Sequence, residues 1–285
     1  MVIEMSALQG VMGRYYALRS GETPAVAAAI FEAYLPKSTG DALPASKAGQ
    51  VIGAADRLDS LAGLFAAGLA PSGTKDPFAQ RRAALGLVQA LIGCEVPFDL
   101  RKALQLAAEG LPVQASPDVL AACFDFVGGR LRTYLMEEGG FRFDVVDAVL
   151  AVQAANPLGA WRGAKDLAAW IVRPEWKDFL AAYSRCVRIT RDNKETFGIQ
   201  PAAFSEAVEG ELFAAIQSAE TGRGSASVDG FINAFLPLIP VINRFFEAVL
   251  VMADDPTVRA NRLGLLQRVA ALASGAADLS NLEGF

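Results

Sequence analysis

Apolar residues recur along this chain at helical spacing, and alternating apolar runs rich in β-branched residues are nearly absent. Leu58, Leu61 and Phe65, for example, share one face at about 100° per residue. Asp56 and Asp59 lie on the other face. The pattern predicts helices over residues 6–19, 23–34, 45–67, 77–92, 99–110, 117–137, 143–154, 162–172, 174–191, 201–219, 227–252 and 256–277. We therefore expect an all-α fold.

Glycine and proline clusters divide the expected helices into two groups. Gly139 and Gly140 form one strong break, and residues 156–159 form another. We place the boundary at the first break and expect helical domains at 1–140 and 141–285. Residues 221–225 are expected to form a flexible link between two later helices.

Residues 71–92 are expected to form a tight loop followed by a helix. Asp76 resembles an N-cap, because its carboxylate can accept hydrogen bonds from the unpaired N–H groups of a first turn. Pro77 would then fill the first helical position. Phe78, Leu85 and Val88 would form the apolar stripe that faces the core.

Two arginines near the start of this helix depart from the usual pattern. The helix dipole disfavours cations at an N-terminus, yet Arg81 and Arg82 lie there, and Arg81 falls within the apolar stripe. A departure of this kind is expected at a functional site or at a buried ion pair. Arg81 therefore either faces a groove or pairs with Asp56, Asp59 or Asp76.

The composition excludes several kinds of chemistry. None of the 285 residues is histidine, which removes imidazole bases, His-based triads and HExxH metal sites. Cys94, Cys123 and Cys186 are odd in number and far apart, as in a reducing cytoplasm. The net charge of −5 gives no global basic surface, so contact with nucleic acid would need a local patch.

Neither a membrane span nor a signal peptide is expected. The most apolar stretch, residues 231–251, is broken by Pro237, Pro240 and several polar residues. The segment that begins at Met1 has neither a basic start nor an apolar core.

Three arginines recur at every third position in the second half of the chain. Arg185, Arg188 and Arg191 follow one slowly drifting helical face, and such a stripe can neutralise several phosphates. Tyr183 lies beside them and could stack on an exposed base. The alternative is a solvated basic face, balanced by the nearby acidic residues Glu175, Asp178, Asp192 and Glu195.

The last predicted helix carries a second group of candidates. Asp254 or Asp255 is expected to cap it. Arg259 and Asn261 are expected to point outward, where they can contact RNA. Arg262 falls at the edge of the apolar stripe, so we expect it to be structural and paired with an acid such as Asp254.

Four stretches resemble the β subunit of bacterial tetrameric glycyl-tRNA synthetase and follow one another as in that family. They are L-Q-G-V-M-G-R-Y-Y-A at 8–17, A-D-R-L-D-S-L-A-G-L-F at 55–65, P-S-G-T-K-D-P-F-A-Q-R-R-A-A-L-G at 71–86 and V-M-A-D-D-P-T-V-R-A-N-R-L-G-L-L at 251–266. The resemblance spans nearly the whole chain, which is similar to the C-terminal part of that longer subunit. It implies an HD-like helical domain followed by an anticodon-binding helical bundle of the DALR type.

The resemblance to the HD family implies a degenerate metal site. The run A-D-R-L-D is similar to the segment that carries the family's last conserved aspartate, which would be Asp56. The family's His-Asp pair would fall at Gln9 and Gly10. Asp56 and Asp59 could share a hard cation in principle. Without histidines or a third carboxylate nearby, the hydrolase site is expected to be lost, and no metal is expected.

By this resemblance, the intact enzyme joins glycine to its tRNA using ATP. The α subunit would carry the chemistry with ATP and Mg²⁺, and this chain would hold no catalytic residue and no cofactor. Its partners would be glycine tRNA and the α subunit, without a membrane, in the cytoplasm. The residues expected to contact RNA are Lys75, Arg81 and Arg82 in the first domain and Tyr183, Arg185, Arg188, Arg191, Arg259 and Asn261 in the second.

Two alternatives remain open from the residues alone. One is a protein-binding helical adaptor, which the net acidity favours. The other is a degenerate phosphohydrolase of the HD type with residual metal chemistry on Asp56 and Asp59.

Overall fold

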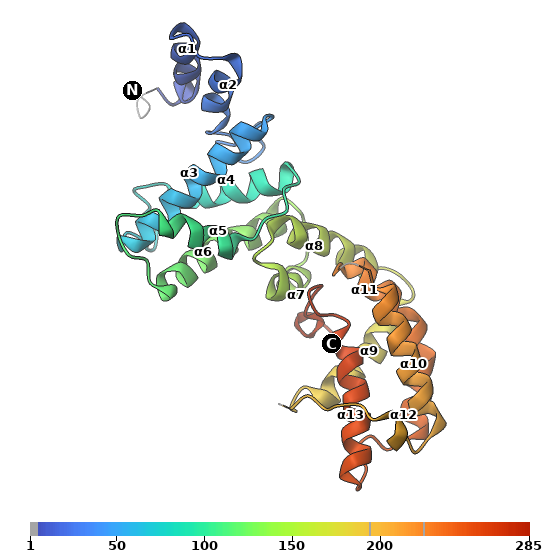
Figure 1. The fold of residues 1–285 in the computed structure, drawn as a ribbon. Coiled ribbons are helices and arrows are strands. Elements are labelled where there is room, and N and C mark those ends of the chain that lie inside the picture. The colour runs from blue at the N-terminus through green and yellow to red at the C-terminus, as the bar shows by residue number, and fades with distance from the viewer. Residues whose placement is uncertain (1–4, 194, 225) are drawn as a thin grey trace. The chain divides into compact units, whose positions relative to one another are not determined.

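The computed structural model describes residues 5–193, 195–224 and 226–285. The described residues do not include residues 1–4, Lys194, which follows the arginine stripe of residues 185–191, or Ser225 in the expected link. The described residues form α-helices, short 3₁₀ turns and one isolated bridge between Ser72 and Lys75 (Figure 1). The all-α prediction is confirmed.

The chain divides into two compact units. The first comprises residues 1–140 and 154–161, and the second comprises 141–153 and 162–285. The helices of the first unit are α1 (Val11–Arg19), α2 (Pro24–Glu32), α3 (Lys47–Ala66), α4 (Gln80–Gly93), α5 (Leu100–Glu109) and α6 (Pro117–Glu137). Helix α8 (Pro157–Ile171) begins in the first unit and continues in the second.

The second unit contains the remaining helices. They are α7 (Phe143–Gln153), α9 (Trp176–Thr190), α10 (Ala207–Gly222), α11 (Val228–Phe235), α12 (Ile239–Ala248) and α13 (Pro256–Ala271). The HD-like and anticodon-binding identities of the two domains stay predictions.

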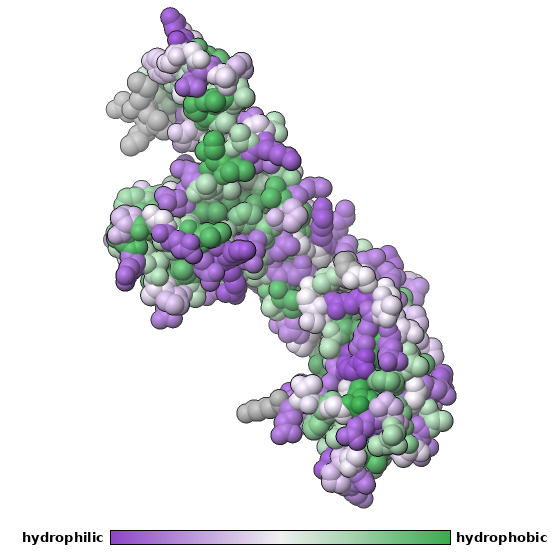
Figure 2. All heavy atoms as spheres, in the orientation of Figure 1, coloured by the Kyte–Doolittle hydropathy of each residue, from purple (hydrophilic) through white to green (hydrophobic). Residues whose placement is uncertain are grey.

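Helices α3, α4, α5 and α6 pack together in the first unit. The predicted face of α3 is buried, with Leu58, Leu61 and Phe65 at most 8% exposed. Leu87 on α4 and Leu131 on α6 are fully buried beside them. Figure 2 shows that hydrophilic side chains cover much of the visible surface, whereas hydrophobic ones also reach it in the α1–α4 part.

An aromatic cluster forms part of the core of the second unit. The Phe179 ring on α9 lies 5.0 Å from Phe235 on α11, centroid to centroid. Tyr183, one turn further along α9, lies 5.4 Å from Phe231 and 6.2 Å from Phe285. Edge-to-face ring pairs of this kind stabilise a core beyond their buried area.

Two predicted helix starts are confirmed by side-chain caps. The Thr23 hydroxyl accepts the Val26 N–H at 3.3 Å, with Pro24 in the first turn of α2. Asp255 is the cap of α13, and its carboxylate accepts the N–H groups of Thr257 and Val258 at 2.7 and 3.1 Å.

Helix α4 begins three residues later than predicted. The Asp76 carboxylate does accept first-turn N–H groups, from Gln80 at 2.8 Å and Arg81 at 2.9 Å. The residue directly before the helix is Ala79, whose φ of 53° is left-handed and breaks the helix there. Pro77 and Phe78 therefore lie in the loop, and Phe78 is 51% exposed rather than in the core.

Two predicted breaks are helical instead. Helix α8 begins at Pro157, where proline needs no hydrogen-bond partner, and the Asn156 side chain accepts the Gly159 N–H at 3.1 Å. Thr221 and Gly222 belong to α10, so the expected link is shorter than predicted.

The single helix predicted over 227–252 is wrong. The stretch forms α11, a 3₁₀ turn and α12, because Pro237 and Pro240 lack the N–H that a continuous helix requires. By length and hydropathy alone, Val228–Ala248 could cross a membrane, contrary to the expectation that no stretch would qualify. Its Phe231, Phe235 and Phe245 are fully buried within the second unit.

Candidate nucleic-acid interface

Two arginines of α9 lie over aromatic rings at the surface of the second unit. The guanidinium carbon of Arg185 is 4.2 Å from the centre of the Phe246 ring, and that of Arg188 is 5.8 Å from the centre of the Phe285 ring. Both arginines are exposed. The ring beneath each guanidinium restricts its motion, while its other side stays open to phosphate or to a base.

Of the acids expected to balance this stripe, only Asp192 forms an ion pair with it among the described residues. Within the described part of the chain, neither Arg185 nor Arg188 forms an ion pair. Arg191 approaches Asp192 with an Nε–Oδ1 distance of 3.8 Å, and both side chains are mostly exposed, so this pair is weak. Arg185 and Arg188 therefore keep their charges available.

Tyr183 is not available to stack on a base. Its side chain is buried among Phe179, Phe231 and Phe235, and its hydroxyl donates to the Ala270 carbonyl at 3.2 Å. Burial raises the pKa of this hydroxyl well above its ordinary value. The prediction of an exposed ring is wrong because Tyr183 lies on the core face of α9.

Asn261 does not point outward either. It is 2% exposed, and its amide forms two hydrogen bonds with the backbone of Gln200, accepting from N at 2.7 Å and donating to O at 2.9 Å. Both polar atoms of the side chain are therefore engaged in holding the loop before α10. Arg259 is half-buried, and its Nη1 donates to the Ala253 carbonyl at 3.2 Å.

Arg262 is structural, as expected, but its partner is Glu209 rather than Asp254. The Nε and Oε1 atoms are 2.6 Å apart, and both side chains are buried. The Arg262 guanidinium also donates to the Leu250 carbonyl at 2.8 Å and to the Ser205 hydroxyl at 2.9 Å. Every part of this buried cation is thus compensated.

In the first unit, Arg81 is held within its own loop. Its guanidinium donates to the Gly73 carbonyl at 2.5 Å and lies 3.9 Å from the Asp76 carboxylate. The ion-pair interpretation is supported, with Asp76 as the partner. Lys75 and Arg82 are both exposed.

Arg82 lines a cavity of about 280 Å³ in the first unit, whose wall is partly polar and partly apolar. The three stretches of this unit that carry the family resemblance all reach it, because Gln9, Asp56 and Arg82 share its wall. Sequence reasoning missed the fourth contributor, the turn after α2, which places Tyr34 and Lys37 there. That turn carries no motif of its own.

The cavity does not fit a metal. Among the described residues, no group of three or more Cys, Asp or Glu side chains is placed to hold a metal ion. Asp56 shares this cavity with the cationic side chains of Lys37, Arg57 and Arg82. Like-charged groups oppose a bound cation, so the arrangement disfavours the residual metal chemistry of a phosphohydrolase.

Arg57 forms part of the frame of this cavity. Its Nη1 donates to the carbonyls of Gly53 and Ala33 at 2.8 and 3.2 Å, and its Nη2 donates to those of Leu35 and Pro36 at 3.0 and 3.2 Å. Burial lowers the pKa of Arg57, and the charge of Asp56 partly opposes that shift.

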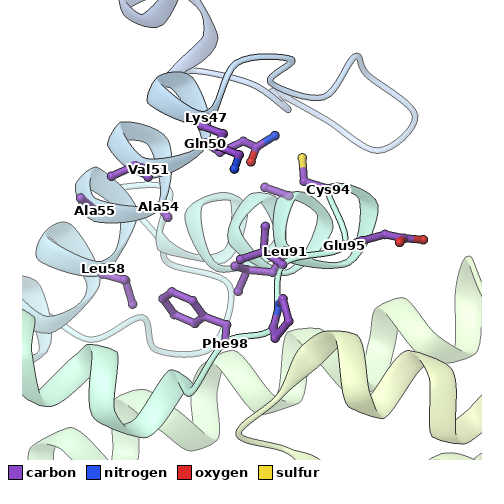
Figure 3. Close-up of a pocket in the computed structure, with 13 residues that line it drawn as sticks. Lys47, Gln50, Val51, Ala54, Ala55, Leu58, Leu91, Cys94, Glu95 and Phe98 are labelled. Carbon is purple, nitrogen blue, oxygen red and sulfur yellow. The ribbon is translucent and has the colours of Figure 1, made fainter.

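A second hollow, of about 580 Å³, lies between α3 and α4 and the segment that follows α4 (Figure 3). Leu58, Leu91 and Phe98 are among its apolar walls, and Lys47 and Glu95 are among its few polar residues. None of the predicted RNA-contacting residues lines it, and nothing in its walls suggests chemistry.

Comparison with known proteins assigns the family. Residues 1–151 match the family described as glycyl-tRNA synthetase beta subunit. The glycine–tRNA ligase beta subunit of Desulforudis audaxviator is 40% identical over 288 residues, which cover 98% of this chain and 41% of that protein. The corresponding protein of Moorella thermoacetica is 37% identical, with 99% of this chain and 42% of that protein covered.

A plant relative shows the same similarity. The glycine–tRNA ligase, chloroplastic/mitochondrial 2, of Arabidopsis thaliana is 37% identical over 287 residues, or 100% of this chain and 27% of that protein. The chain therefore belongs to the glycyl-tRNA synthetase beta subunit family. It spans about two fifths of the length of the bacterial relatives named here.

Proposed function

We propose that this chain is the tRNA-gripping part of a glycine–tRNA ligase. It binds and positions glycine tRNA and contributes no bond-making group of its own. The observation that carries the proposal is the pair Arg185 and Arg188, two exposed guanidinium groups with no ion-pair partner in the described residues. Membership of the glycyl-tRNA synthetase beta subunit family supports tRNA as the class of RNA that is bound.

The wider assembly is part of the same proposal. An α subunit would activate glycine with ATP and Mg²⁺, and the chain would act in the cytoplasm. The RNA contacts would come from Lys75, Arg82 and Arg81 in the first unit. In the second they would come from Arg185, Arg188, Arg191 and Arg259, whereas Tyr183 and Asn261 are buried and would make no contact with RNA.

A salt titration of tRNA binding tests the proposal. Affinity for glycine tRNA and for a non-cognate tRNA is measured with the full chain between low and physiological salt. We expect affinity to fall steeply with salt, because each neutralised phosphate releases counterions. Replacing Arg185 and Arg188 together with alanine should weaken binding and reduce the salt slope by about 1 for each phosphate that is no longer neutralised.

The matched control is the double variant Arg244→Ala with Arg268→Ala. It also removes two positive charges from the second unit, but these arginines already pair with Glu211 and Glu220. We expect it to bind tRNA almost as the parent chain does. If both double variants lose tRNA affinity equally, the effect reflects net charge alone. If the chain binds no tRNA even at low salt, a protein-binding adaptor is favoured instead.

A further inference from the structure

Two exposed aromatic side chains line the cavity of about 280 Å³ in the first unit. Tyr34, just after α2, is 42% exposed, and Phe78, just before α4, is 51% exposed. Single exposed aromatic residues are common at protein surfaces, but here two of them border the same cavity. Such rings form stacking platforms for unpaired bases.

The charge around the cavity suits an anion. Lys37, Arg57 and Arg82 face it together with a single carboxylate, Asp56. The Lys37 ammonium donates one hydrogen bond to the Gln9 carbonyl at 2.9 Å, which holds it at the wall and leaves further donors. Arg82 has no hydrogen bond or ion pair within the described residues.

The backbone at the cavity wall is held in an uncommon conformation. Ala79 lies between Phe78 and the first turn of α4 with φ 53°, and it lines the cavity itself. A non-glycine residue in this region is strained, and such strain is found mainly where a neighbouring group has to be placed. Here it fixes the path of the loop that carries Phe78 and the approach of α4, which carries Arg82.

We propose that this cavity holds one unstacked nucleotide, with its base against Phe78 and Tyr34 and its phosphate on Lys37 and Arg82. A hollow of about 280 Å³ is small for a ligand pocket and suits a single nucleotide rather than a duplex. The inference rests on the proposed RNA binding and adds the place where a single-stranded end is gripped. A free nucleoside monophosphate offers the same chemistry, and the experiment separates the two sources.

The experiment measures binding of three probes to the full chain. They are a fluorescent, 5′-phosphorylated RNA tetra-adenylate followed by anisotropy, and AMP and inorganic phosphate used as its competitors. Phe78→Ala should weaken tetra-adenylate binding about tenfold, the loss expected for one stacked base. Arg82→Ala should weaken it by a similar factor and flatten the salt dependence.

Matched controls use residues of equal exposure or charge away from the cavity. Phe143→Ala removes an aromatic ring that is 49% exposed on α7 in the second unit, and Lys102→Ala removes one exposed positive charge on α5 in the first. Both should leave tetra-adenylate affinity unchanged. A tetranucleotide in which 5-iodouridine replaces one adenosine should crosslink under light to Phe78 or Tyr34, which tests the location without changing the protein.

The outcomes are distinguishable. Tetra-adenylate binding much tighter than that of AMP supports an RNA strand, and equal binding of AMP supports a free nucleotide in the same pocket. Competition by phosphate as strong as that by AMP, or equal losses in Phe78→Ala and Phe143→Ala, would overturn the proposal. If tetra-adenylate does not bind while tRNA still does, the pocket is refuted and the wider RNA-binding function stands.

Discussion

The carboxylate of Glu209 on α10 and the guanidinium of Arg262 on α13 form a buried ion pair 53 positions apart in sequence. Burial raises the pKa of Glu209, but hydrogen bonds from Arg262 and from the backbone of Glu206 and Ser205 outweigh it. The folded pKa therefore lies below the ordinary value of 4.5. The pair fixes the loop before α10 against the last long helix.

Replacing Glu209 with glutamine should destabilise the chain by about 3 kcal/mol at pH 7, because it leaves a buried guanidinium unpaired. The contribution of Glu209 is complete above pH 4.5 and is lost as the pH falls through its lowered folded pKa. Urea unfolding at several pH values should show the variant and the parent chain converging in acid. Glu211→Gln, which loses an exposed pair with Arg244, should cost about 0–1 kcal/mol.

Arg57→Met should destabilise the first unit by about 3 kcal/mol or more. The methionine fills part of the space but leaves four backbone carbonyls without the donors that Arg57 supplies. Thermal unfolding followed by circular dichroism measures the loss. Arg19→Met, on an exposed arginine of α1, provides the comparison, and equal effects of the two changes would contradict the structural role of Arg57.

Tyr183→Leu should lower stability and leave tRNA affinity unchanged. The leucine keeps an apolar side chain in the aromatic cluster but loses the hydroxyl bond to Ala270 and the ring packing, so we expect about 2 kcal/mol. Affinity is compared at a temperature where circular dichroism shows the variant folded. A tenfold loss of affinity in the folded variant would show that the ring reaches RNA after all.

The three cysteines should react with a thiol reagent at different rates. Burial raises the pKa of the Cys123 and Cys186 thiols to about 12, and both are fully buried. Cys94 is partly exposed, and its pKa is raised as well. Because the thiolate is the reactive form, native protein at pH 8 should label slowly at Cys94 and almost not at the other two. Unfolding in urea should expose all three thiols to the reagent. Prompt labelling of Cys123 without urea would contradict the packing of α6.

Sequence reasoning located the helices because their apolar faces repeat regularly, as on α3. It predicted Phe78 to be buried and Tyr183 to be exposed, and the structure shows the reverse. A left-handed Ala79 breaks the helix between Phe78 and its stripe, and alanine gives no local signal for that conformation. Tyr183 lies beside the arginine stripe in sequence, but its own direction on α9 is set by the partners on α11, which periodicity along one helix does not reveal.

The cavity of the first unit shows a further limit. Its walls come from four separated stretches, and only the tertiary fold brings Lys37 close to Arg82. In the sequence, the family resemblance pointed to Asp56, and the unusual position of a cation near a helix N-terminus pointed to Arg82. It offered no reason to link them with the turn after α2.

The assignment of residues 154–161 to the first unit makes the two units interleaved along the chain. Trp161 packs on Tyr134 with ring centres 5.7 Å apart, and the Ala155 carbonyl accepts the Leu100 N–H at 2.8 Å. The polypeptide therefore crosses from one unit to the other three times, and no single cut releases both as complete bodies. A single crossover between related chains would therefore leave one of the two units with a segment from each parent.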